Sequence, residues 1–492
     1  MAYYAIGIGG TGSKCLETLI HLAAAGMMPD KQDLYVLFVD PDAANGSLGR
    51  AVKTLECYKT FSNNAQLAQP YLLQTQIDST ANPIFSPFND DNDDKPRLEK
   101  FFDYAGLRLA DDGAADIFEV LYSEKERTTQ LHEGFRGHPS IGAAVMAQTV
   151  LGGGEPWKTF NSKVAKDPNP KIFLAGSIFG GTGASGFPTI AQLIKNALKE
   201  KPVNPQIGGA LVLPYFTFND EGGDAQLKAK AEHFLMNTQA ALEYYHRWNK
   251  DLVYNSIYLI GDDSQVQVGN FSLGGQTQQN EQHFIELYAA LAAIHFFDKD
   301  SEADETDGAA QYFRLNRLNN PLKWADLPDG DGGVKIQLKL RQLYHFSVAY
   351  LDIYKPAIDD ISKGQLSGDQ APWCIDFFKR NKPNRIPLND PRTEASLKSV
   401  KTYCENFLVW LANIQNSKKD AGKAFKPIIV SDTNGFDLTK CINLISSDST
   451  MEPLNSTALN RLWGNMCRTK GKGEGTDIGK FLSALYQNCE KI

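Results

Sequence analysis

The sequence predicts an α/β protein: a doubly wound, Rossmann-like parallel sheet, then a central linking helix and a helix-rich C-terminal domain. Two observations lead to this fold class. Short apolar runs alternate with segments of helical periodicity up to about residue 297, and two of these runs end in glycine-rich turns. From residue 334 onward the pattern is mainly that of helices joined by Gly, Pro, Asp and Asn turns.

The first expected elements are a strand at 3–8, a helix at 14–25 and a strand at 34–40. The second strand is almost wholly apolar, which is typical of parallel strands covered on both faces. Between Gly46 and Glu133 the periodicity weakens, and we interpret this segment as an insertion.

Beyond the insertion, strands and helices alternate again. The expected elements are a helix at 141–150, a strand at 171–179, a helix at 188–198, a strand at 208–216, a helix at 224–248, a strand at 253–261 and a long helix at 276–297. Parallel strands need such helical crossovers, so the alternation predicts a parallel sheet.

Composition and charge restrict the class of protein. The 492 residues include 50 basic and 58 acidic side chains, a net charge of −8, which argues against direct nucleic-acid binding. Seven scattered cysteines without a CxxC pair argue against a disulfide framework. The longest nearly apolar run, Leu287–Phe297, is shorter than the ~18 residues of a membrane span, and no leader pattern is present. We expect a cytoplasmic protein without a transmembrane segment.

The turn after the first strand, Gly7–Gly12, has the form G-x-G-x-x-G. Glycine lets backbone N–H groups approach a phosphate, and the following helix presents its positive N-terminus to the anion. With Asp40 at the end of the next strand, the loop is typical of a Rossmann dinucleotide site, although the same pattern also packs a helix on a strand. A Walker loop is excluded because Cys15 follows Lys14.

A second glycine loop, Gly180–Gly186, again lies between an expected strand and an expected helix. Its glycines, Thr182 and Ser185 provide N–H and hydroxyl donors suited to a di- or triphosphate. One dinucleotide half-site does not need this loop. The segment around Gly137 and His138 adds a further expected helix N-terminus that could face a terminal phosphate.

The string GGTGASG at 180–186 resembles the signature loop of the tubulin/FtsZ family of GTPases, usually written GGGTG[ST]G. Further segments resemble other family loops in family order: IGIGGTGSK at 6–14, VDPDA at 39–43, RGHPSIG at 136–142, LPYFTFNDEGG at 213–223 and QQNEQHFIELYAALAAI at 278–294. The resemblance covers roughly residues 1–297 and indicates a divergent, prokaryotic-type tubulin-like protein.

This resemblance implies a GTP/GDP site in which Glu221 contacts the ribose and Asn280 recognises guanine. No basic side chain in the glycine loops offsets the charge of a triphosphate, so we expect Mg²⁺, with Asp42 as the nearest ligand. The other expected nucleotide-binding residues are Gly9, Gly10, Thr11, Gly12, Ser13, Asp40, Asp42, Gly137, His138, Gly180, Gly181, Thr182, Gly183, Ala184 and Ser185.

Family members hydrolyse GTP mainly when acidic residues after the central helix dock onto the nucleotide of the next subunit. The family's NxDxxD pattern is not legible in this chain. The segment 322–327 resembles its FADV end and makes Asp326 one candidate catalytic acid. Asp298 or Asp300, directly after the expected helix, is the rival placement, and the third alternative is that no catalytic acid is present.

We therefore expect a protein that hydrolyses GTP at head-to-tail contacts of a cytoskeletal-type filament. Phe179 in place of a signature glycine and the long insertion depart from the family pattern, and the helical second half counts against polymerisation. One alternative is a non-polymerising, GTP-dependent switch that recruits other proteins, with the helical domain as the contact. An alternative from another class is a NAD-binding Rossmann oxidoreductase, which leaves the loop at 180–186 unexplained.

The domain organisation follows from the same patterns. We expect a nucleotide-binding domain at 1–271 with the insertion at about 46–133, a core helix at 272–297, an acidic linker with the candidate catalytic loop at 298–333, and a helical domain at 334–492 with a single strand at 427–431.

Overall fold

The computed structural model describes residues 2–29, 32–65, 67, 72–88, 96–131, 134–135, 137–149, 151, 153–218, 231–247, 253–262, 266–268, 280–299, 310–315, 326–327, 334–367, 369–378, 388, 390–417, 456–470 and 476–491. Glu221, Asp300 and the expected strand at 427–431 lie outside the described residues.

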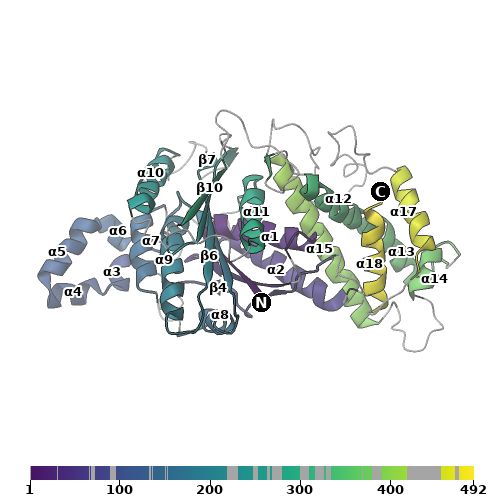
Figure 1. Ribbon diagram of the computed structural model, residues 1–492, viewed down its shortest axis with the longest axis horizontal. Coiled ribbons are helices and arrows are strands. Elements are labelled where there is room, and N and C mark those ends of the chain that lie inside the picture. Colours follow the sequence, from purple (N-terminus) through teal and green to yellow (C-terminus); the bar gives the residue numbers. More distant parts are fainter. Residues whose placement is uncertain are drawn as a thin grey trace.

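An eight-stranded sheet forms the centre of the described structure (Figure 1). Seven strands follow the order β10 (Gln311–Leu315), β8 (Ser256–Ile260), β6 (Gln206–Val212), β5 (Lys171–Ser177), β1 (Ala2–Ile8), β2 (Asp33–Val39) and β3 (Ile77–Asp78), and β4 (Ile84–Phe85) pairs with β2. All pairs are parallel. The predicted doubly wound parallel sheet is therefore confirmed.

The strand order reverses direction between β1 and β5. From β1 the chain builds outward through β2 to β3, and it then returns to β5 on the other side of β1 and continues to β10. In such sheets the carboxyl ends of the two strands at the reversal border a crevice that commonly holds a ligand. The first and second glycine loops follow these two strands, β1 and β5.

Helices cover both faces of the sheet, which explains why β1 and β5 are almost entirely buried. One face carries α1 (Gly9–Ala24), α2 (Gly46–Ala65) and α11 (Ile285–Asp298), and the other carries α7 (Pro139–Ala147), α8 (Trp157–Val164) and α9 (Gly181–Leu198), with α10 (Ala231–Arg247) nearby (Figure 1). In α1, Leu16, Leu19 and Ile20 recur at helical spacing and are buried, so this helix lies flat on the sheet.

The part of the chain after residue 334 is helical where it is described, as predicted. Its elements are α12 (Val334–Ala349), a π-helical turn (Tyr350–Tyr354), α13 (Lys355–Ser362), α14 (Pro372–Phe378), α15 (Pro391–Asn416), α17 (Ser456–Arg468) and α18 (Asp477–Cys489). Helix α15 packs along α2 and reaches α1, where the Trp410 indole donates to Thr18 Oγ1 at 3.2 Å. None of the described helices is long and apolar enough to cross a membrane.

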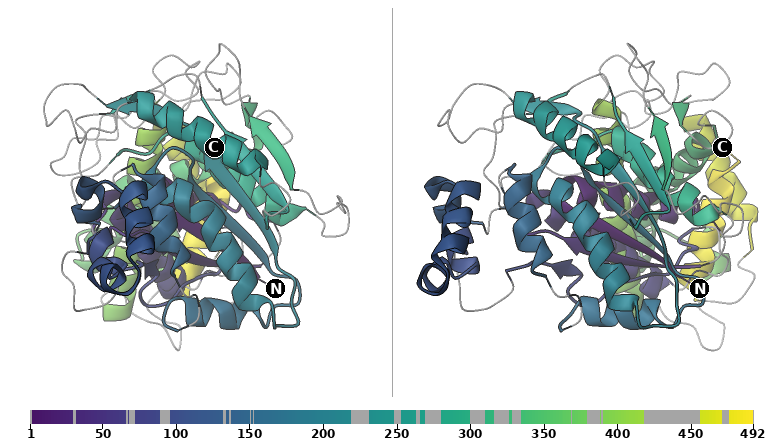
Figure 2. Two further views of the ribbon diagram at one scale, coloured as in Figure 1. Left: turned by 90° about the vertical axis from the view of Figure 1, so that its left-hand side faces the viewer. Right: turned by 60° about the vertical axis from the view of Figure 1, so that its left-hand side comes forward.

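The segment expected as an insertion contains two kinds of structure. Helix α2 and strands β3 and β4 belong to the layered body. The short helices α3 (Leu98–Phe101), α4 (Tyr104–Ala110), α5 (Asp112–Leu121) and α6 (Glu124–Thr128) instead form a group that stands apart from the body in the right-hand view of Figure 2. Leu109 and Val120 on this group are 91% and 85% exposed.

Three elements differ from the expectations. The central helix was expected at 272–297. Residues 272–279 lie outside the described residues, residues 280–284 are not helical, and α11 begins at Ile285, whose amide donates to the His283 ring at 3.1 Å. The expected linker at 298–333 contains β10, which extends the sheet. The short strands β7 (Phe216–Phe218) and β9 (Val266–Val268) pair with each other in a separate sheet.

Candidate functional site

The three glycine-containing loops meet beside the carboxyl ends of β1 and β5. A Cβ atom placed on Gly9 would lie 3.3 Å from Cβ of Thr182, so the first loop touches the second. A Cβ atom on Gly181 would lie 3.2 Å from the amide nitrogen of Gly137, so the second loop touches the third. The structure therefore brings together segments that are far apart in the sequence.

Each loop leads into a helix whose start lacks a side-chain cap. The residues before α1, α9 and α7 are Ile8, Gly180 and His138, and none of them makes a side-chain capping hydrogen bond. The starts of α5 and α18 are capped by Asp111 and Thr476, whereas those of α8 and α11 also lack a side-chain cap, so it is the convergence of three uncapped starts that distinguishes this place. Uncapped first-turn N–H groups and positive helix ends attract anions, so the crevice is suited to a polyphosphate.

Two glycines allow these helices to approach β5 closely. A Cβ atom on Gly12 would lie 2.2 Å from the carbonyl oxygen of Ala175, and one on Gly183 would lie 2.4 Å from that of Ser177. Both contacts are with backbone, which cannot move aside cheaply. Gly12 and Gly183 therefore set the position of the two loops.

The predicted phosphate-contacting residues differ in accessibility. Ser13 and Ser185 are buried, and their hydroxyls donate to the carbonyls of Gly9 at 3.0 Å and Gly181 at 2.7 Å. Gly9, Gly12, Gly181, Gly183 and Ala184 are also buried. The residues that remain accessible to a ligand are Gly10, Thr11, Gly137, His138, Gly180 and Thr182.

Asn237, on α10, ties the second and third loops together. Its amide nitrogen lies 3.2 Å from the carbonyl oxygen of Gly137 and 3.4 Å from that of Phe179. Phe179 itself is buried against Tyr215 and Phe234, so the residue that replaces the signature glycine anchors its loop in an aromatic cluster. Asn237 belongs to no motif, so nothing in the sequence marks it.

The third loop also meets the separate helical group. His138 Nδ1 lies 3.5 Å from a carboxylate oxygen of Glu126 on α6, and the His138 side chain is 51% exposed. Burial alone would raise the pKa of Glu126, but its hydrogen bonds with Ser123 and the nearby His138 lower it. Glu126 is thus an ionised group beside the third loop, and no sequence motif marks it.

The end of β2 supplies the acidic side of the site. Asp40 is buried, accepts the amide of Asp42 at 3.1 Å, and burial raises its pKa to about 8. Asp42 is also buried and accepts the amide of Ala44 at 3.0 Å. Asn45 caps α2 by accepting the amide of Ser47, and its own amide group lies against Gly10.

This arrangement fits a magnesium ion only in part. No cluster of three or more potential metal ligands exists among the described residues. Mg²⁺ in nucleotide sites is often held by one or two carboxylates together with phosphate oxygens and water. Asp42 could provide such a carboxylate, because Asn45 places this segment beside the first loop.

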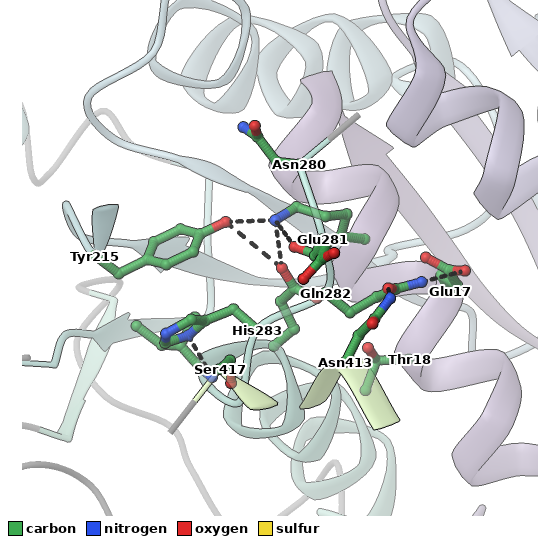
Figure 3. A network of polar contacts seen from close by, with 12 residues as sticks. Glu17, Thr18, Tyr215, Asn280, Glu281, Gln282, His283, Asn413 and Ser417 are labelled. Atoms are coloured by element: carbon green, nitrogen blue, oxygen red, sulfur yellow. Dashed lines mark hydrogen bonds and ion pairs between the residues drawn. The ribbon is translucent and has the colours of Figure 1, made fainter. Parts of the chain in front are cut away.

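Lys14 follows the first loop but is not available to a phosphate. Its ammonium group lies 2.8 Å from the Tyr215 hydroxyl and 2.7 Å from the Glu286 carboxylate, in a buried network (Figure 3). Burial alone would lower the pKa of Lys14, but Glu286 and Tyr215 hold it above its usual range. The site therefore contains no free lysine from this helix.

Asn280 lies five residues before α11. Its backbone carbonyl accepts a hydrogen bond from Arg50 of α2 at 3.0 Å, and its side chain is partly exposed. Figure 3 shows this side chain directed away from Tyr215 and Gln282. Because α2 starts beside Gly10, the contact with Arg50 places Asn280 on the side of the crevice near the first loop.

Among the candidate catalytic acids, Asp298 lies away from the glycine loops, and Asp300 lies outside the described residues. Asp298 is exposed at the end of α11. Lys171, the first residue of β5, donates to the carbonyl of the neighbouring Phe297 at 2.8 Å, so α11 ends at the amino edge of the sheet, opposite the glycine loops. Asp326 is partly buried beside the buried Leu327.

Comparison with known proteins gives one family match. Residues 135–293 match the model of the family Tubulin_2, described as tubulin like. No curated protein matches the chain significantly. Among solved structures, a GTPγS-bound protofilament of CetZ2 from Haloferax volcanii matches with 16% identity over 62% of this chain and 61% of that chain, at a TM-score of 0.28. The chain thus spans about three fifths of that protein's length.

Proposed function

We propose that this divergent tubulin-like protein binds GTP together with Mg²⁺ in the crevice between β1 and β5. The observation that carries the proposal is the meeting of three uncapped helix starts, those of α1, α7 and α9, at one place. Such a place offers several N–H donors and three positive helix ends to one polyphosphate. The tubulin-like match begins at residue 135 and includes two of these loops.

The accessible residues can be given distinct roles in this proposal. Backbone N–H groups at Gly10, Thr11, Gly180 and Thr182 would bind the phosphates, and the third loop would face the terminal phosphate. Asp42 would hold Mg²⁺ with phosphate oxygens, and the metal would neutralise part of the phosphate charge. The side chain of Asn280 would recognise guanine, as the family resemblance implies.

The NAD-binding alternative receives less support. In a dinucleotide fold, one glycine loop carries the pyrophosphate and an acidic residue accepts a hydrogen bond from the ribose. Here a second loop lies directly against the first at Gly9 and Thr182. Asp40 is buried, and burial raises its pKa, which disfavours the carboxylate form that would accept a hydrogen bond from the ribose.

Thermal unfolding in the presence of different nucleotides tests the proposal. With Mg²⁺ present, we expect GTP to raise the melting temperature more than ATP or NAD, since a ligand at 100 times its Kd stabilises a fold by about 2.7 kcal/mol. Differential scanning fluorimetry measures this shift. Stabilisation by NAD alone would overturn the proposal in favour of the oxidoreductase.

We further propose that GTP is hydrolysed where two copies meet head to tail. Asp298 and the glycine loops lie at opposite edges of the sheet, so an exposed acid at that position can reach only the nucleotide of another subunit. A contact between two different faces of the same chain propagates into a filament unless it closes into a ring. This placement supports the interface mechanism that the family resemblance implies.

Replacing Asp298 by Asn tests this second step. We expect GTP turnover to fall by roughly a hundredfold or more, as for loss of a general acid or base, with the affinity for GTP unchanged. Phosphate release measured over a range of protein concentrations gives the turnover, and Asp369→Asn, at another exposed aspartate, is the control. Turnover per subunit that does not depend on protein concentration, without pelletable polymer, would instead support the switch that recruits partner proteins.

A further inference from the structure

The segment that carries Asn280 is held by a polar network that includes Glu17, whose contact with Gln282 is drawn in Figure 3. Glu17 lies on α1 and is buried. Its carboxylate accepts hydrogen bonds from Arg50 Nε at 3.2 Å, from Thr54 Oγ1 at 3.3 Å and from Gln282 Nε2 at 2.9 Å. A buried carboxylate with several donors is a rigid anchor, because any displacement leaves its charge poorly satisfied.

Arg50 joins this anchor directly to Asn280. Its Nε donates to Glu17, and one of its terminal nitrogens donates to the backbone carbonyl of Asn280 at 3.0 Å. A guanidinium group presents its donors in a fixed planar arrangement. The two contacts therefore fix the carbonyl of Asn280 relative to α1, the helix that begins in the first glycine loop.

The C-terminal helices hold the same segment from another side. The Asn413 amide, on α15, donates to the Gln282 side-chain oxygen at 2.7 Å. One turn later, the Ser417 hydroxyl accepts the backbone amide of Phe284 at 2.9 Å. Residues 280–284 are thus held between α1, α2 and α15 just before α11 begins.

The side chain of Asn280 keeps its own hydrogen-bonding capacity. It is partly exposed, and none of the described residues forms a hydrogen bond with its amide group. An amide group on a fixed backbone loses little conformational freedom when it binds a ligand, which favours both affinity and selectivity.

We propose that Arg50 and Glu17, supported by Gln282 and Asn413, are positioning residues that set the preference of this site for guanine over adenine. The inference rests on the proposed function, because it requires that Asn280 reads the base. It also gives α15, in the C-terminal helical part, a role in nucleotide selection.

The network acts on the base and not on the phosphates. The glycine loops are held by other contacts: Gly12 and Gly183 against β5, and Asn237 between the second and third loops. Loss of Arg50 or Asn413 would therefore release Asn280 but leave the phosphate-binding loops in place. GTP would lose its base contact, whereas ATP, which has no such contact to lose, would bind as before.

Nucleotide affinities of variants test this inference. For Arg50→Ala we expect the dissociation constant for ATP divided by that for GTP to fall about tenfold, with the ATP constant unchanged. The reason is that a lost hydrogen bond to the base mainly affects the discrimination between guanine and adenine. Arg50→Lys should retain part of the ratio, because a lysine can reach one of the two partners but not both. Asn413→Ala should lower the ratio severalfold although it lies outside the crevice. Isothermal titration calorimetry measures both constants.

Two further variants calibrate the experiment. Asn280→Ala gives the full loss of discrimination, and Lys53→Ala, an exposed lysine on the same helix as Arg50, should change nothing. A wild-type protein with no preference for GTP would overturn the proposed function itself. A wild-type preference that survives in both Arg50→Ala and Asn413→Ala would overturn only the positioning role. Equal weakening of GTP and ATP, with a lower melting temperature, would show a merely structural network and would also overturn it.

Discussion

Replacing Gly181 by valine is expected to reduce GTP affinity by at least about a hundredfold, because the new side chain would occupy the junction between the second and third loops. A Cβ atom at this position would lie 2.9 Å from Cβ of Phe135 and 3.2 Å and 3.3 Å from the amide nitrogens of Gly137 and His138. The start of α9 and the third loop would have to separate. Their N–H groups could then no longer face the same phosphates.

Equilibrium binding of a fluorescent GTP analogue measures this loss. The control is Gly49→Val, because Gly49 lies on α2 and no atom lies within 4 Å of its Cβ position. Circular dichroism checks that both variants keep their secondary structure. Unchanged affinity in a folded Gly181→Val variant would show that the ligand does not use this junction.

Replacing Lys14 by methionine is expected to lower the free energy of unfolding by about 3–5 kcal/mol, the usual effect of removing one partner of a buried ion pair. Lys14 and Glu286 are both almost completely inaccessible to solvent, and their charged atoms lie 2.7 Å apart. Without Lys14, the Glu286 carboxylate would keep only the Tyr215 hydroxyl, at 3.5 Å, as a side-chain donor. Urea unfolding followed by circular dichroism measures the change.

The pH dependence of this variant has a definite sign. Burial raises the pKa of Glu286 even in the wild-type protein, and without Lys14 the carboxyl group would bind its proton still more tightly in the folded state. A group with a raised pKa favours the folded state below its unfolded pKa, about 4.3 for glutamate, and this contribution is lost as the pH rises through the folded pKa. The deficit of Lys14→Met relative to wild type should therefore be smaller at pH 5 than at pH 7.

A double variant separates the buried charge from the lost packing. Lys14→Met combined with Glu286→Leu removes both charges, and we expect it to be more stable than Lys14→Met alone. If the double variant is as unstable as the single one, the cost comes from packing around α1 and not from an unpaired carboxylate.

The sheet and its glycine loops could be predicted because their signals are local. Unbroken apolar runs such as 34–40 mark buried parallel strands, and the glycines at 7–12 and 180–186 mark the turns that follow two of them. The expected helix at 272–297 was wrong at residues 280–284 for a tertiary reason. Residues 282–284 satisfy their polar groups with α1 and α15, which no periodicity in the sequence reveals.

The candidate site also combines features that the sequence predicts with features that only the tertiary structure reveals. The sequence indicated which glycines could face a phosphate, but Ser13 and Ser185 turn their hydroxyls back onto their own helices, which depends on how closely α1 and α9 pack on β5. Asn237 and Arg50 lie on helices without a motif. Their importance comes only from the backbone carbonyls that the fold places next to them.

The sequence by itself determined the fold class and the three glycine-containing loops, because strand, turn and helix preferences depend on neighbouring residues. Only the tertiary structure decided three arrangements. The three helix starts converge, Lys14 forms a buried ion pair with Glu286, and Asp298 lies at the edge of the sheet opposite the glycine loops. These arrangements depend on contacts between residues that lie far apart in the chain. For example, the Lys14 ammonium group donates to the carbonyl of Glu281, 267 positions later. Such contacts are fixed by the packing of whole layers and leave no pattern in the local sequence.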